Sequence, residues 1–299
     1  MELYMIIAIT TGLFFSLRHI VNKYIIENHM SGIAWYYYYT AISIISFPII
    51  SWLISPIVFP SMQSWFYIIS SSTVSFIAVL ILIYALTIGD VTTAGPVISS
   101  KPIFIVPLSF IFLGEFYGFA IIGWILLIVF GAIMTSWNQG MKSKHVLSNR
   151  ALGLFFITTV LMAMVSIFSK PALQELDHFN YMGWWHIVQA PLLLAFMPFV
   201  MNKTEKINFR KRWKSTLPYA ILENVVLYGS MITLFFALKY SVTLTEALVT
   251  TQGVFTVVIG SIISRINPNF LAEKHTKQIY IIRFLGAILI LIGVYQILL

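Results

Sequence analysis

The chain has 299 residues, of which 59% are hydrophobic and 9% are charged, with a net charge of +8 and a mean hydropathy of +0.91. A soluble domain carries about 25% charged residues, so this composition excludes a water-soluble protein and predicts an integral membrane protein. The chain contains no cysteine, which excludes disulfides, thiolate metal sites and cysteine nucleophiles.

Ten segments are apolar enough to cross a bilayer as helices, which takes about 20 residues each. Long unbroken apolar runs exclude the polar–apolar alternation of a membrane β-barrel. The expected helices are residues 3–27, 32–54, 64–88, 91–113, 117–137, 151–170, 181–201, 217–239, 242–264 and 279–298. The first lacks a basic leader and a cleavage site, so we expect it to remain as a span. The fold class predicted is therefore an all-α integral membrane protein.

The second half of the chain repeats the first. Residues 91–104 (VTTAGPVISSKPIF) align with residues 242–255 (VTLTEALVTTQGVF) at an offset of 151. We therefore expect two five-helix repeats, residues 1–140 and 150–299. An odd number of helices inverts the second repeat relative to the first. Inverted repeats are typical of secondary transporters, whose substrate site lies near the membrane midplane where the halves meet.

Small residues and one acidic residue recur along the first half: Tyr84-Ala85-Leu86, Gly95-Pro96, Pro107, Leu113-Gly114-Glu115, Gly123 and Gly131. This pattern resembles the EamA repeat of the drug/metabolite transporter superfamily. The second half is similar through Phe236-Ala237-Leu238, Gly286 and Gly293, but it has Ser264-Arg265 where the family has a Gly-Glu pair. The resemblance implies a ten-helix basket around a central cavity, lined mainly by helices 1, 3, 4, 6, 8 and 9.

Lys101 lies about ten residues into the fourth expected helix, near mid-membrane, where a lysine costs about 2.5–3.5 kcal/mol. Two interpretations remain open. Lys101 forms a structural ion pair with Glu223 or Glu246, or it is a cavity cation that binds an acidic group of a substrate. We predict the second, because neighbouring prolines such as Pro102 expose carbonyls and suit a helix that lines a cavity.

Further polar groups are candidates for the same cavity. Arg18 and Asn22 share one face of the first helix, although Arg18 also lies where a side chain reaches the interface. Gln252 aligns with Lys101 in the repeat, and Asn224 lies in the eighth helix. We predict that these four residues, with Lys101, bind the substrate.

Glu223 is the candidate for proton coupling, because a buried carboxylate exchanges protons near neutral pH. The alternative is an ion pair with Lys101 or Arg18. We expect structural roles for two other glutamates: Glu246 near the start of the ninth helix, and Glu115 as a cap of the helix at 117–137. The aromatic run 35–39 predicts mainly an interfacial belt, and Lys170 an interfacial lysine.

These features predict a secondary active transporter of a small polar metabolite, anionic or zwitterionic, working by alternating access. The sequence contains no GxxxxGK[ST] motif for a nucleotide, so an ion gradient or exchange would drive it. We expect no cofactor and no metal, and no nucleic-acid partner, since the basic residues lie in short loops. The alternative is an intramembrane enzyme or a lipid flippase on the same scaffold. The oligomeric state is left open.

The basic residues lie mostly on one side of the expected membrane, and this bias predicts the orientation of the chain. Thirteen of the 18 lysines and arginines lie in or beside three loops, against two on the opposite side. The thirteen are Lys142, Lys144, Arg150, Lys203, Lys206, Arg210, Lys211, Arg212, Lys214, Arg265, Lys274, Lys277 and Arg283. We expect the protein in the cell (inner) membrane. By the positive-inside rule the charge bias places both termini outside the cytoplasm.

We expect a single cysteine at Asn208 to resist a membrane-impermeant thiol reagent in intact cells, while one at Met1 or Leu299 reacts. The cysteine-free chain makes each label specific. The family resemblance implies the opposite orientation, with both termini inside. Labelling at Asn208 without permeabilisation would therefore overturn the charge-based prediction.

Overall fold

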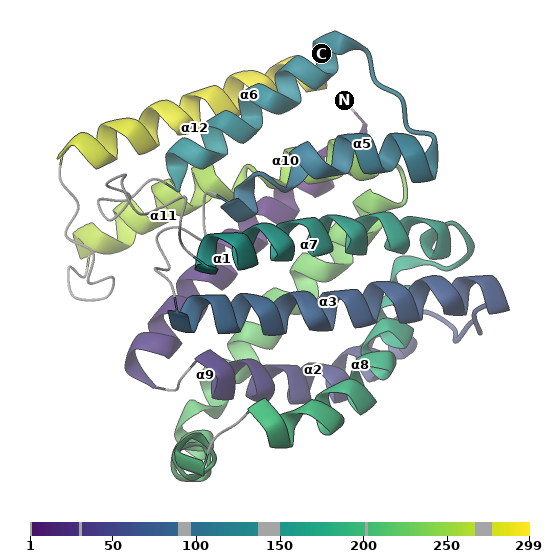
Figure 1. Cartoon of the computed structure of the whole chain (residues 1–299), viewed down its shortest axis with the longest axis vertical. Coiled ribbons are helices and arrows are strands. Elements are labelled where there is room, and N and C mark those ends of the chain that lie inside the picture. Colours follow the sequence, from purple (N-terminus) through teal and green to yellow (C-terminus); the bar gives the residue numbers. More distant parts are fainter. Residues whose placement is uncertain (1, 30–31, 89–96, 137–149, 201–202, 267–276) are drawn as a thin grey trace.

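The computed structural model describes residues 2–29, 32–88, 97–136, 150–200, 203–266 and 277–299 (Figure 1), and regular structure in these ranges is entirely helical. The helices are α1 Leu3–Asn28, α2 Gly32–Ile54, α3 Met62–Ile88, α5 Lys101–Leu113, α6 Phe119–Thr135, α7 Arg150–Glu175, α8 His178–Val200, α9 Lys203–Leu238, α10 Val242–Val249, α11 Gln252–Ile266 and α12 Lys277–Leu298. The two termini lie near the same end of the bundle (Figure 1). We call this end the termini side.

Seven helical segments in the described ranges are long and apolar enough to cross a membrane. They begin at residues 3, 32, 62, 150, 209, 242 and 278. Two shorter apolar helices, Val97–Leu113 and Phe119–Thr135, lie among them. The predicted all-helical, multi-pass membrane protein is therefore confirmed in its class.

The outside of the bundle is apolar, and polar side chains collect inside. Leu53, Phe66 and Phe119 are largely exposed, although each is a large hydrophobic residue. Ser71 and Glu223, in contrast, are fully buried. Apolar side chains cost nothing against lipid, whereas a polar group in hydrocarbon needs a partner, so the bilayer selects this distribution.

Four helix pairs provide the main packing. α3 packs along α7, and α1 packs along α9. α2 packs along α8, and α6 packs along α12. Figure 1 shows α6 and α12 side by side at one edge of the bundle and α2, α8 and α9 toward the other edge. Each of the four pairs joins a helix before residue 140 to a helix after residue 150.

The fourth and ninth expected helices are interrupted, where the sequence predicted continuous ones. Residues 97–99 are helical, Ser100 is a turn, and α5 starts at Lys101. α10 ends at Val249, Thr250 and Thr251 form turns, and α11 starts at Gln252. The interruptions fall at positions related by the same offset of 151 residues. Residues 91–96 of the fourth expected helix lie outside the described residues.

α1 contacts the interruption of the ninth helix with its backbone. A Cβ at Gly12 would lie 2.5 Å from Oγ1 of Thr251 and 2.9 Å from the backbone N of Gln252. Only glycine allows so close an approach. At the interruption of the fourth helix, the contact comes from α7, where Oγ1 of Thr159 donates a hydrogen bond to the carbonyl of Val97 at 3.3 Å.

α9 is longer than predicted. The sequence assigned residues 202–216 to a loop, but the helix already begins at Lys203 and continues through Pro218. Figure 1 shows the start of α9 nearly end-on, while the rest runs through the bundle. Arg212 anchors this start by donating to the carbonyl of His29 at 2.8 Å. The apolar-run criterion misses such a segment because its charged residues belong to the interface rather than to hydrocarbon.

α6 and α12 meet through glycines. A Cβ at Gly131 would lie 2.6 Å from the carbonyl oxygen of Gly286 and 3.0 Å from the N of Ile290, and a Cβ at Gly286 would lie 2.6 Å from the carbonyl oxygen of Gly131. Small residues let membrane helices approach closely where dispersion must replace the hydrophobic effect. Gly123, also in α6, has nothing within 4 Å of an added Cβ.

We expect Gly131→Ala to lower stability by about 1–3 kcal/mol, because the added methyl group meets rigid backbone and forces the two helices apart. Gly123→Ala is the matched control in the same helix and should leave stability unchanged or slightly higher. Thermal unfolding of the purified protein in detergent measures both. Equal midpoints for the two variants would show that the α6–α12 contact is not tight.

Candidate functional site

Arg18 of α1 and Glu223 of α9 form a buried ion pair. Nε of Arg18 lies 2.7 Å from Oε1 of Glu223, and the two side chains are 22% and 0% exposed. The same oxygen accepts a hydrogen bond from Nδ2 of Asn22 at 3.1 Å. Arg18 and Asn22 thus share one face of α1, as predicted, and both meet Glu223. Of the partners considered for Glu223 from the sequence, the structure pairs it with Arg18.

Two aromatic side chains of α2 extend this group. Nε1 of Trp35 donates to Oδ1 of Asn22 at 2.6 Å. The hydroxyl of Tyr39 accepts from Nη2 of Arg18 at 3.1 Å, and the guanidinium also lies 5.5 Å from the centre of the Tyr39 ring. Such contacts fix the direction of both Arg18 and Asn22.

Two buried acceptor atoms on α9 lack a partner. Oε2 of Glu223 and Oδ1 of Asn224 have no hydrogen bond within the described protein. The amide of Asn224 donates instead to the carbonyls of Tyr39 and Ala220, at 3.2 and 2.8 Å. Unpaired buried acceptors are uncommon and mark places where a proton, water or ligand can bind.

Lys101 lies at the helix interruption and forms the second buried ion pair. Its Nζ lies 2.6 Å from Oε1 of Glu246 in α10, with side chains 20% and 5% exposed. Nζ also donates to Oγ of Ser166 in α7 at 3.1 Å, and that hydroxyl donates to Glu246 Oε1 at 2.5 Å. The structure thus shows the ion pair with Glu246 that the sequence left open, and the side chain of Lys101 stays partly exposed.

Gln252 occupies the position in α11 that Lys101 occupies in α5. Its side chain lies beside His19 of α1. One turn further along α11, Oγ1 of Thr256 donates to Oγ of Ser16 at 3.0 Å. Gln252 therefore contacts the helix that carries Arg18, while Lys101 contacts α7.

Glu115 caps a different helix from the one predicted. Its carboxylate accepts from the backbone N of Val242 at 2.9 Å and of Thr243 at 3.1 Å, so it caps α10 and not α6. Lys170, expected at the interface, lies 2.5 Å from Glu115. Burial raises the pKa of Glu115, but the bonds from Lys170 and the two backbone N–H groups outweigh it, and the net shift is downward. The free N–H groups at the start of α10 attract the carboxylate because they lie within its reach across the bundle.

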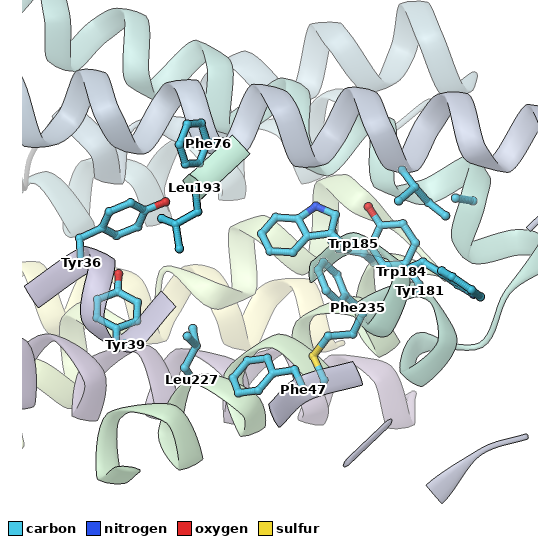
Figure 2. Close-up of a cluster of buried hydrophobic side chains, with 14 of the residues drawn as sticks. Tyr36, Tyr39, Phe47, Phe76, Tyr181, Trp184, Trp185, Leu193, Leu227 and Phe235 are labelled. Atoms are coloured by element: carbon cyan, nitrogen blue, oxygen red, sulfur yellow. The ribbon is translucent and has the colours of Figure 1, made fainter. Parts of the chain in front are cut away.

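The sequence predicted that the aromatic run 35–39 is mainly an interfacial belt, but the structure places it in the interior. All five residues are buried. Figure 2 shows Tyr36 and Tyr39 at one end of a buried cluster and Tyr181 and Trp184 toward the other. The prediction failed because aromatic rings suit an interface and a protein interior equally well.

Sequence reasoning missed two site residues, Tyr39 as a ligand of Arg18 and Ser166 as the bridge between Lys101 and Glu246. The spacing of Trp35 and Tyr39, four residues apart at the start of α2, was an available signal that both share a face. Nothing in the sequence distinguishes Ser166 from the other buried hydroxyls. The side chain of Lys23 in α1 lies outside the described part of the structure.

A comparison with known protein families supports the resemblance seen in the sequence. Residues 2–137 match the EamA-like transporter family. The resemblance to EamA-type transporters is confirmed. The match covers the first half, which contains the Leu113-Gly114-Glu115 motif, and it agrees with a multi-pass membrane transporter.

A solved structure shares the fold of nearly the whole chain. A crystal structure superposes over 97% of this chain and 96% of its own, with a TM-score of 0.70 and 14% sequence identity. At this identity the likeness shows the fold alone. No curated protein sequence matches the chain.

Proposed function

We propose that this EamA-like protein is a secondary active transporter that moves a small polar metabolite across the cell membrane by alternating access. One observation carries the proposal. Two buried ion pairs, Arg18–Glu223 and Lys101–Glu246, join the two halves, and Lys101 lies at a helix interruption. Interrupted helices that bring charged groups to mid-membrane are typical of transporter binding sites.

The proposal includes ten spans, arranged as inverted repeats of residues 1–140 and 150–299. The helix contacts support it. Exchanging the halves turns the α1–α9 contact into the α7–α3 contact, and it turns α2–α8 and α6–α12 into themselves. The matching interruptions at Ser100 and at Thr250-Thr251 add to this support. Because the two halves pack alike, each half can adopt the conformation of the other. This exchange gives the two states, open to opposite sides, that alternating access requires.

We propose that the substrate is anionic or zwitterionic and that Lys101, Gln252, Arg18, Asn22 and Asn224 bind it. Each ion pair presents a cation with a carboxylate beside it, and Lys101 and Arg18 are the partly exposed members. A ligand that carries an acidic group therefore meets the cation first. The ammonium of a zwitterion would have Glu223 Oε2 as a free acceptor.

The alternatives are an intramembrane enzyme and a lipid flippase. Uptake of radiolabelled metabolites into sealed proteoliposomes separates them. A transporter needs the sealed membrane, whereas an enzyme turns over its substrate in detergent. A flippase moves a labelled phospholipid but no soluble metabolite.

We expect Lys101→Ala to abolish uptake. The variant also leaves Glu246 buried without a partner, which costs about 3–5 kcal/mol of stability. The double variant Lys101→Met/Glu246→Gln removes both charges, so it should recover the melting temperature without recovering uptake. Lys101→Arg should restore little, because a guanidinium differs from an ammonium in shape and donors.

Melting temperature in detergent and uptake in proteoliposomes are measured on the same preparations. Lys170→Ala, at the more peripheral ion pair with Glu115, is the matched control for the loss of one lysine. Uptake by the double variant at the wild-type rate would make the Lys101–Glu246 pair purely structural.

We expect Glu223→Gln to uncouple transport from a pH gradient while exchange of bound substrate persists. The amide keeps an oxygen for Arg18 and Asn22, but it removes the free Oε2 at which a proton would bind. Glu175→Gln, a carboxylate on the termini side that bonds Ser61, is the control and should keep the wild-type pH profile. An unchanged pH profile for Glu223→Gln would remove this residue from the coupling mechanism.

A further inference from the structure

The half-helices α5 and α10 are joined at three depths. At the interruption, Lys101 pairs with Glu246 at 2.6 Å. Two turns toward the termini side, Oγ of Ser109 and Oγ1 of Thr243 share a hydrogen bond of 2.6 Å. At the end of α5, Glu115 accepts from the first two N–H groups of α10. These contacts close the bundle from its middle to the termini side.

α10 is built as a separate segment. It has eight residues, all of them buried, between its N-cap Ser241 and the interruption at Thr250-Thr251. Because the interruption divides it from α11, α10 can shift without moving the rest of the ninth helix. Oγ1 of Thr245 is buried without a partner in the present arrangement.

The carboxylate of Glu246 binds Lys101 as the acid of a ligand would. Its Oε1 accepts from both Nζ of Lys101 and Oγ of Ser166. One ammonium cannot neutralise two carboxylates in a low-dielectric site, so a second carboxylate at Lys101 competes directly with Glu246.

Building on the transporter function proposed above, we propose that Glu246 is a built-in competitor for the substrate: a carboxylate of the substrate takes its place on Lys101, and α10 separates from α5 to open the termini side. Ser166 remains to donate to the incoming carboxylate. The displaced Glu246 is then unpaired among apolar neighbours, so the arrangement in which α10 has moved and Glu246 meets water is favoured. The substrate class follows as carboxylates.

The proposed opening of the α5–α10 contact is called the gate below. Labelling of a cysteine inside this contact tests the gate without any ligand. Ser109→Cys changes one atom, its side chain is fully buried, and the native chain has no other cysteine. In nanodiscs, where both faces are accessible, a polar maleimide should label it slowly. Adding Glu246→Gln removes the charge that holds Lys101, and labelling should accelerate about tenfold or more, as a minor open state becomes the major one.

Two further variants distinguish a switch from general loosening. The charge swap Lys101→Glu/Glu246→Lys restores the pair in reverse and should return Ser109→Cys to slow labelling, which also shows that the bundle is folded. Glu115→Gln weakens only the outer end of the contact and should accelerate labelling far less than Glu246→Gln does. Equal acceleration by both, or none by Glu246→Gln, would overturn the assignment of Glu246.

Acetate tests whether Lys101 accepts a free carboxylate. Glu246→Ala leaves Lys101 with space beside it, so acetate should raise the melting temperature of this variant relative to chloride at equal ionic strength. Lys101→Met/Glu246→Ala should not respond. Absence of an acetate shift in Glu246→Ala would overturn the carboxylate assignment. A failed gate test with intact uptake in sealed vesicles would leave the transporter function standing, whereas absent uptake with responsive labelling would count against the function alone.

Discussion

A charged side chain inside a bilayer protein must find its counter-charge within the protein, and this constraint determines how the two halves meet. Three ion pairs described above, Arg18–Glu223, Lys101–Glu246 and Lys170–Glu115, each take one member from before residue 140 and the other from after residue 150. Neither half alone satisfies these charges. The pairs therefore specify the register of the halves more than they stabilise it, since desolvation offsets much of the Coulomb attraction.

The same balance suits a protein that changes conformation. When an ion pair contributes little net stability, one of its members can exchange its partner at little cost in free energy, provided that neither charge is left unpaired. A neutral side chain donates to the carboxylate of each inner pair, Ser166 to Glu246 and Asn22 to Glu223. The outer contact differs, because Glu115 is held by a lysine and by two backbone N–H groups at once.

Much of the fold was predictable because lipid permits few solutions. Apart from the start of α9, apolar runs located most helix ends within a few residues, and the repeat aligned the two helices that prove to be interrupted. The interruptions themselves were not predictable from Ser99-Ser100 and Thr250-Thr251, because Ser-Ser and Thr-Thr pairs also occur within continuous helices of this chain. The start of α9 was missed because charge disguises a helix at the interface.

The site was predictable as a set of residues but not as a set of pairs. Arg18, Asn22, Lys101 and Glu223 stood out because ionisable and amide groups are rare in such a chain. Which carboxylate meets which cation depends on helix packing over more than a hundred residues of sequence separation, and local spacing carries no such information. The target of Glu115 was misassigned for this reason, since the nearest helix in the chain is not the nearest in space.

The backbone contact at Gly12 gives the molecule a mechanical property of its own. With no side chain as a spacer, α1 rests directly on Thr251 and Gln252, the joint between α10 and α11. A displacement of that joint is transmitted to α1, and six residues further along α1 is Arg18. The two inner ion pairs make no direct contact with each other, yet they share this rigid rod. Binding of a substrate at Lys101 would then change the affinity of Glu223 for a proton, so the two inner ion pairs would be coupled within a single chain.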